Sequence, residues 1–139
     1  MRRGARAMDD HGAKSWLYHF EFPLRGIMKL PYAFLGNFHA SELGFVFKTW
    51  VAGDSVSQQM SSTFQRYWGN LAHTGDVNAD PADADRLRAD AGWHDNNGPA
   101  RVAWPHHNRT TDLNIVLDMP PQVQKNLYDD KCDFWDKHL

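Results

Sequence analysis

The chain has 139 residues, of which 42% are hydrophobic and 13% aromatic, a composition that allows one domain with a modest core and excludes disorder over most of the length. Its formal net charge of −2 argues against a protein that binds nucleic acid or an anionic membrane surface. No apolar run approaches the length of a membrane span.

The first predicted element is a strand that follows a polar N-terminal end. Residues 1–13 are polar and rich in arginine, which predicts a frayed, disordered end, and they lack the apolar core of a signal peptide. The compartment is therefore not indicated. Residues 15–22 alternate strictly, and Pro23 ends the alternation, which is typical of a β-strand. One face of this strand would carry Trp16, Tyr18, Phe20 and Phe22.

Two helices are predicted in the middle of the chain. A short helix is expected over residues 40–50, with one face formed by Leu43, Val46, Phe47 and Trp50. A long helix is expected over residues 55–74, because Ser55 and Gln58 fit a capping box and Gly75 supplies a C-terminal stop. Its apolar face would carry Val56, Met60, Phe64, Tyr67 or Trp68, and Leu71, which we interpret as core.

The C-terminal part begins with a solvated segment. Residues 79–98 mix charges of both signs with alanine, which predicts a loop or a loose helix. Residues 112–117 then alternate as a short strand, which ends before Pro120. A closing helix is expected over residues 123–139, with Tyr128, Cys132, Trp135 and Leu139 on one face.

His39 is the candidate functional residue. It lies between a glycine-containing turn and an apolar run, where a histidine can be held in the orientation that a general base needs. The alternative is an ordinary loop histidine that makes one backbone hydrogen bond. A metal site is not expected, since His39 and Glu42 match no zinc or di-iron spacing and the adjacent His106 and His107 do not share a helical face. No glycine-rich phosphate loop or dinucleotide fingerprint is present, so no cofactor is predicted.

The segment around His39 has the pattern Gly36-x-x-His39-x-x-Glu42-Leu-x-Phe-Val-Phe47. It resembles the histidine motif of the type-B carboxylesterases, the family that includes the cholinesterases. Three further stretches resemble that family in the same order: Tyr67-Trp-Gly-Asn-Leu-Ala-His-Thr-Gly-Asp-Val-Asn78, Trp104-Pro105 and Lys131-Cys-Asp-Phe-Trp-Asp136. The resemblance implies an α/β fold, namely the C-terminal portion of an α/β-hydrolase with an incomplete sheet of few strands and three helices. Residues 14–139 would form this part, with a variable loop at 79–101.

The resemblance also implies roles for single residues. His39 would be the histidine of a Ser–His–acid triad, and Glu42 would support its loop. The chain has no G-x-S-x-G nucleophile motif, so the nucleophile and the acid are expected outside it, and the chain alone is predicted to be inactive. The family cysteine at the position of Cys132 is often bridged to an earlier one, whereas Cys132 is the only cysteine here, and we expect a small buried residue.

The expected function is that of a carboxylic-ester hydrolase acting on small-molecule esters, and family members are often secreted. Expected partners are the missing N-terminal part of the hydrolase or a second copy of the chain. Two alternatives remain open at this point. One is a non-catalytic member, similar to the cell-adhesion proteins of the family, and the other is a truncated product without independent function.

Overall fold

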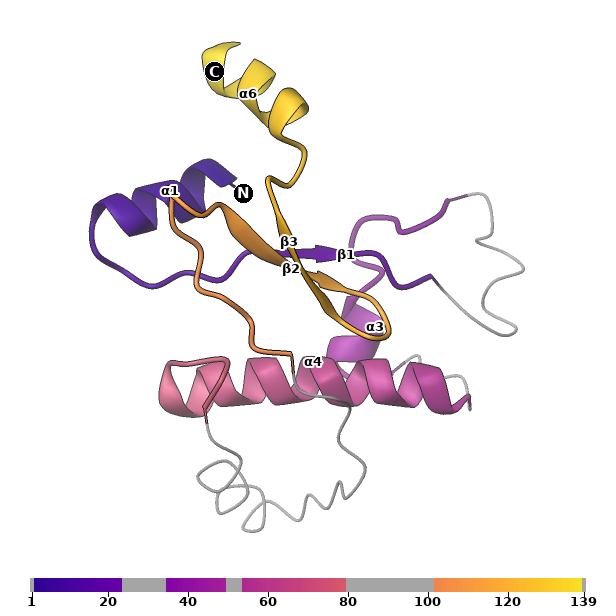
Figure 1. Cartoon of the computed structure of the whole chain (residues 1–139). Coiled ribbons are helices and arrows are strands. Elements are labelled where there is room, and N and C mark those ends of the chain that lie inside the picture. Colours follow the sequence, from indigo (N-terminus) through magenta and orange to yellow (C-terminus); the bar gives the residue numbers. More distant parts are fainter. Residues whose placement is uncertain (1, 24–34, 50–53, 80–101, 139) are drawn as a thin grey trace. The chain divides into compact units, whose positions relative to one another are not determined.

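The computed structural model describes residues 2–23, 35–49, 54–79 and 102–138 (Figure 1). The chain forms two compact units. The first comprises residues 1–20, 102–117 and 121–139, and the second comprises residues 21–101 and 118–120. Trp50 and nearly all of the predicted variable loop lie outside the described residues.

A small mixed sheet is the centre of the first unit. It has the order β1-β2-β3, with β1 at Tyr18–Phe20, β2 at Leu113–Leu117 and β3 at Gln122–Lys125. Strand β1 runs parallel to β2 with Tyr18 opposite Ile115, whereas β2 and β3 form an antiparallel pair. The two strands predicted from alternation are therefore confirmed, although β1 is shorter than residues 15–22. Residues 114–117 of β2 are buried, as expected for a central strand.

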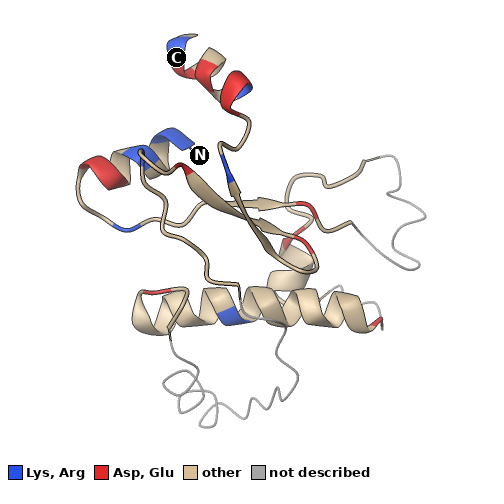
Figure 2. Ribbon diagram, in the orientation of Figure 1, with Lys and Arg blue, Asp and Glu red and all other residues tan. Residues whose placement is uncertain are grey.

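The N-terminal end differs from the prediction, because residues 2–10 form helix α1 (Arg2–Asp10) rather than a disordered end. The physical reason is long-range charge pairing. Arg2 and Arg6 on α1 bind aspartates more than 100 residues away in the sequence, which local composition cannot reveal. Figure 2 shows the basic residues on α1 and the acidic residues on α6.

The predicted closing helix over residues 123–139 is wrong in its first part. Residues 122–125 pair with β2 as strand β3, and helix α6 occupies Asp129–His138. Between them, Asn126 and Tyr128 adopt left-handed backbone conformations, with φ values of 60° and 52°, which separate the strand from the helix. No residue of α6 is buried, so the expected apolar face is not part of a core here.

The second unit contains helices α3 (Leu43–Val46) and α4 (Ser55–Thr74), which pack against each other. The bounds predicted for α4 are confirmed, and Gly75 ends the helix with a φ of 74°. The cap is Asp54 rather than Ser55, because the Asp54 carboxylate accepts a hydrogen bond from the Ser57 backbone N–H at 2.9 Å. The core positions of this helix are confirmed at Met60, Phe64 and Tyr67, whereas Leu71 is exposed.

Helix α3 is a single turn, much shorter than the predicted 40–50. Its buried side is also different from the predicted one, since Phe45 is buried while Leu43 and Phe47 are exposed. Helical spacing cannot select the buried side of a helix this short, because two turns are needed before a stripe is defined. Together with α1 and α6, the described residues hold four helices rather than the three expected. None of these is long and apolar enough to cross a membrane.

Candidate functional site

His39 lies in a series of turns that leads into α3. Gly36 and Ala40, on either side of His39, have φ values of 55° and 67°, so the chain bends sharply there. The backbone N–H of Ser41 donates to the Phe38 carbonyl at 3.1 Å, which closes the turn around His39. The imidazole is exposed to solvent. The loop therefore presents His39 outward on a tightly bent backbone.

The anchor of this loop is Phe45, two residues into α3. Its side chain is 2% exposed and packs edge-on against Phe22, with ring centroids 5.3 Å apart. Its carbonyl accepts a hydrogen bond from the Ser61 hydroxyl of α4 at 2.7 Å. The apolar run after His39 thus fixes the base of the loop through one side chain and one carbonyl.

Glu42 takes part in the loop through its backbone. It is the residue before α3, and its carbonyl accepts hydrogen bonds from the N–H groups of Phe45 and Val46 at 2.9 and 3.0 Å. Its side chain makes no capping hydrogen bond. The role of the Glu42 side chain in supporting the loop therefore stays a prediction.

The chemistry of His39 needs further groups. A triad histidine requires a hydroxyl to deprotonate and a carboxylate that holds its tautomer. Within the described ranges, no hydrogen bond joins the His39 ring to either kind of group. The described residues thus form an exposed imidazole on an anchored loop.

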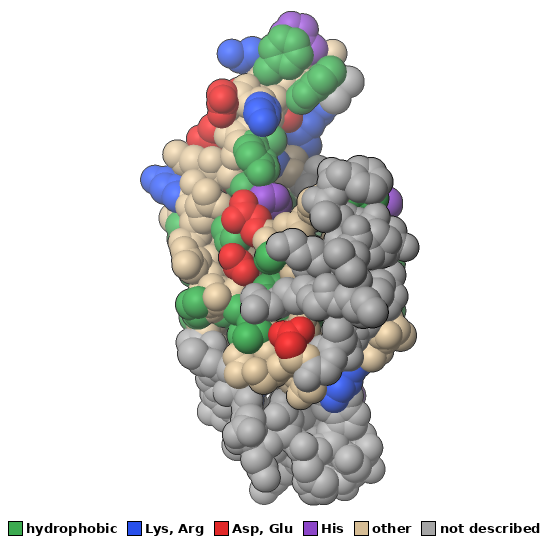
Figure 3. Space-filling view, turned by 90° about the vertical axis from the view of Figure 1, so that its right-hand side faces the viewer, with side chains coloured by type: hydrophobic (Ala, Val, Ile, Leu, Met, Phe, Trp, Pro, Cys, Tyr) green, Lys and Arg blue, Asp and Glu red, His purple; other side chains and the backbone are tan. Residues whose placement is uncertain are grey.

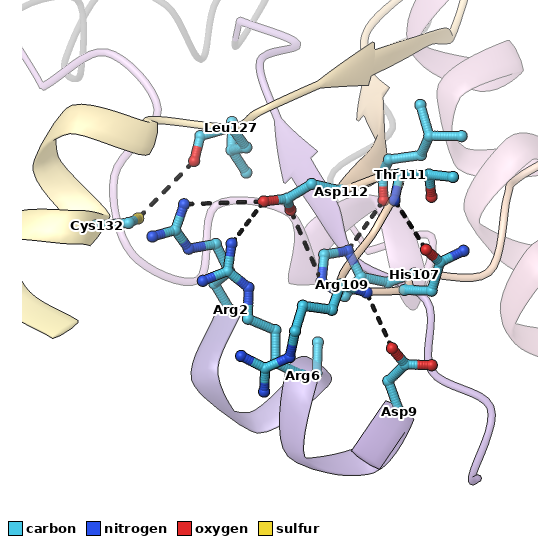
Figure 4. A network of polar contacts seen from close by, with 12 residues as sticks. Arg2, Arg6, Asp9, His107, Arg109, Thr111, Asp112, Leu127 and Cys132 are labelled. Carbon is cyan, nitrogen blue, oxygen red and sulfur yellow. Dashed lines mark hydrogen bonds and ion pairs between the residues drawn. The ribbon is translucent and has the colours of Figure 1, made fainter.

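A second polar cluster lies in the first unit and involves α1 and the start of β2 (Figure 4). The carboxylate of Asp112 is 2.7 Å from a guanidinium nitrogen of Arg6 and 3.9 Å from one of Arg2. On its other side, Asp112 Oδ1 is 3.7 Å from Nε2 of His107. The His107 ring is fully buried, and its Nδ1–H donates to the Leu113 carbonyl at 3.1 Å.

A histidine paired with a carboxylate is also part of catalytic triads, but His107 cannot act as one. Its ring is 0% exposed, so no substrate arriving from solvent reaches it. The pair instead joins the start of β2 to the arginines of α1. Neighbouring His106 is exposed, and its Nδ1 lies 3.3 Å from the His107 carbonyl oxygen, so the two imidazoles have separate surroundings. Among the described residues, no three metal-ligating side chains gather.

Sequence reasoning missed this cluster and the contact between Ser61 and Phe45. Both join residues far apart in the chain, and neither matches a local motif. For the cluster, the signal in the sequence was the group of arginines near the N-terminus. For the contact, Ser61 lies in a polar run between Met60 and Phe64, which gives no such signal.

The C-terminal helix differs from expectation in its exposure. Cys132 is a free thiol and half-buried rather than buried, with Sγ 3.8 Å from the Leu127 carbonyl oxygen. Tyr128, Phe134 and Trp135 are 47%, 52% and 57% exposed. Figure 3 shows hydrophobic side chains at the surface in the region of α6.

Comparison with known proteins places these features in a family. The model of the carboxylesterase family matches residues 1–135. Carboxylesterase 5A of Felis catus is 26% identical over an alignment of 140 residues. The alignment covers 94% of this chain and 22% of that protein. The precursor of the medium-chain fatty acyl-CoA hydrolase of Anas platyrhynchos is 25% identical, with 94% of this chain and 20% of that protein covered. The chain spans about a fifth of the length of these relatives.

Solved structures agree on the fold. The carboxylesterase EST55 of Geobacillus stearothermophilus superposes with a TM-score of 0.67 at 20% identity, covering 97% of this chain and 24% of that one. A PNB esterase gives a TM-score of 0.66 at 23% identity, covering 92% and 23%. The sheet and helices are thus a partial α/β-hydrolase fold. With its family model matched over nearly the whole length, this chain belongs to the carboxylesterase family.

Proposed function

We propose that this chain is the C-terminal part of a carboxylic-ester hydrolase and that His39 is the general base of its triad. The observation that carries the proposal is the family match over residues 1–135, which includes the exposed His39 on its anchored loop. The names of the relatives, carboxylesterase and fatty acyl-CoA hydrolase, support a carboxylic ester or thioester as the substrate class.

The proposed reaction has two halves, acylation and deacylation, and in each of them His39 first accepts a proton and then donates it. It accepts the proton of a serine hydroxyl while the serine oxygen attacks the ester carbonyl carbon. It then donates that proton to the departing alkoxide oxygen, which leaves as an alcohol. In the second half, His39 takes a proton from water as the water oxygen attacks the acyl-enzyme, and it returns the proton to the serine. The acyl group leaves as a carboxylic acid.

The serine, its oxyanion donors and the acid belong, in this proposal, to the part of the relatives that the chain does not span. Oxyanion donors and the nucleophile supply most of the rate enhancement in such enzymes. The chain alone is therefore inactive toward esters. Glu42 acts through the backbone at the start of α3, and its carboxylate is not the triad acid.

A hybrid enzyme tests this proposal. Residues 1–139 replace the quarter of EST55 with which they superpose, and EST55 itself serves as the positive control. We expect the folded hybrid to hydrolyse an activated short-chain ester and the isolated chain to give only background. A hybrid that melts cooperatively, binds substrate and yet shows no turnover would contradict the proposal, as would saturable turnover by the isolated chain.

A further inference from the structure

The hydroxyl of Ser61 is fully buried in the middle of α4, yet its hydrogen bond leaves that helix. Serine and threonine inside helices commonly donate to the carbonyl four residues earlier. Thr63, two residues further on, does this, with its Oγ1 2.8 Å from the Gln59 carbonyl oxygen. Ser61 Oγ instead donates across to the Phe45 carbonyl at 2.7 Å, where donor and acceptor residues are both buried. Helix formation therefore does not explain this bond.

Helix α3 depends on such contacts for its position. A four-residue helix has little stability of its own, because nucleation costs more than one turn returns. Two contacts of Phe45 hold it in the second unit: its ring packs on Phe22, and its carbonyl accepts a hydrogen bond from Ser61. Within the turn after the helix, the backbone N–H of Lys48 approaches the same carbonyl at 3.3 Å, a longer and weaker bond. The Ser61 hydroxyl is thus the short polar tie between α3 and α4.

The tie continues to His39 through consecutive backbone turns. The N–H of Phe45 donates to Glu42 and the N–H of Leu43 donates to Ala40, at 2.9 and 3.2 Å. Ala40 is held in a left-handed conformation, so this stretch has few alternative conformations that keep its bonds. A shift of α3 is therefore transmitted to the backbone of His39.

We propose that Ser61 is a positioning residue for His39, through its hydrogen bond to the Phe45 carbonyl. This inference rests on the proposed function, because it gives Ser61 a role in the same reaction. Catalytic side chains must be held within about 0.5 Å of the productive geometry, and a misplacement of about 1 Å can cost roughly 100-fold in rate. Ser61 itself touches neither substrate nor reacting atoms.

The test compares Ser61→Ala with Thr63→Val in the hybrid enzyme. Each variant removes one buried hydroxyl from α4, but only the first breaks the bond to α3. We expect Ser61→Ala to lower kcat by about 10-fold or more while KM changes by less than about twofold, since loop position affects the proton transfer rather than binding. Thr63→Val should leave kcat unchanged, and Ser61→Thr, which keeps a hydroxyl, should recover most of the loss.

A second measurement does not depend on activity. It is amide hydrogen exchange on the 139-residue chain itself, outside the hybrid, and on the same variants of that chain. Ser61→Ala should raise exchange over residues 41–49 by about 10-fold or more relative to Thr63→Val, because a lost tertiary tie favours local opening. Equal kcat values for Ser61→Ala and Thr63→Val, or unchanged exchange over residues 41–49, would overturn the inference. A loss shared by Ser61→Ala and Ser61→Thr would assign the effect to packing and would also overturn it. If His39→Ala leaves the hybrid fully active, the proposed function fails, and increased exchange in Ser61→Ala would then identify Ser61 as a loop tie without a catalytic role.

Discussion

Arg2 offers a quantitative test of the structure because its guanidinium group, which is almost fully buried, forms ion pairs with several carboxylates. Its side chain is 4% exposed, and its guanidinium nitrogens lie 2.6 Å from Asp129 and 3.1 Å from Asp136, with Asp133 also in hydrogen-bond contact. Burial lowers the pKa of Arg2, but hydrogen bonds to Asp133 and Asp136 together with Coulombic attraction to nearby negative charge outweigh that effect, so the pKa is raised. The substitution Arg2→Met removes the charge and keeps most of the apolar stem.

The magnitude follows from burial of the partners. Breaking a fully buried ion pair from one side costs about 3–5 kcal/mol, because the remaining charge stays unpaired. The aspartates at 129, 133 and 136 are 39%, 55% and 27% exposed, and water partly replaces the lost cation there. Asp112 is 9% exposed but keeps Arg6 at 2.7 Å. Screening of the exposed partners reduces the expected loss to about 2 kcal/mol.

Urea unfolding followed by circular dichroism measures this loss, and Arg3→Met is the matched control. Arg3 lies on the same helix, but its side chain is 59% exposed and its ion pair with Asp136 is 4.0 Å long. We expect the control to change stability by less than about 0.5 kcal/mol. The raised pKa of Arg2 means that its contribution to the free energy of unfolding is lost only when pH rises through that pKa. The contribution should therefore not change between pH 6 and pH 9. Equal losses in the two variants, or a neutral Arg2→Met, would refute the reasoning.

Three further predictions follow from single features. Burial raises the pKa of Tyr67, so the stability that the neutral phenol provides is present below its unfolded pKa of about 10 and is lost as pH rises above that value. In Tyr67→Phe, the free energy of unfolding should therefore fall less with pH between 9 and 11 than in the parent chain, as measured by a fluorescence titration. Gly75→Ala should destabilise α4 by about 1 kcal/mol in thermal unfolding, because the residue has a φ of 74°, and an unchanged melting temperature would contradict this. The isolated chain should self-associate in light scattering, since α6 exposes aromatic side chains and β1 lies at an edge of the sheet as described; a monomer with sharp near-ultraviolet tryptophan bands would show that prediction wrong.

The sequence predicted the elements that carry their own start and stop signals. The bounds of α4 followed from the capping pattern at Ser55 and Gln58 and from Gly75 after the helix, and β2 followed from alternation that ends near Pro120. The end of the chain was misread because apolar residues at 128, 132 and 135 happen to fit a helical period, although none of them is buried. A pattern in sequence cannot show whether a core exists on the other side of a helix.

The elements that were missed depend on distant partners. Helix α1 forms where a disordered end was expected, since Arg2 and Arg6 bind carboxylates that follow more than 100 residues later. The same holds for the candidate site. His39 was proposed from its motif, whereas the proposed role of Ser61 required the geometry, because a serine inside an amphipathic helix carries no sequence signal for a bond to another helix.

The central claim is that His39 is the base of an ester hydrolase, and His39→Ala in the hybrid enzyme tests it most directly. The matched control is His73→Ala, another exposed histidine, on the last turn of α4. We expect His39→Ala to lower kcat by about 10³-fold or more, because losing the base of a triad is nearly as harmful as losing all three members, and we expect the control to stay near the parent value. A folded His39→Ala hybrid with kcat within about twofold of the His73→Ala control would contradict the account, because a triad base cannot be removed at so small a cost.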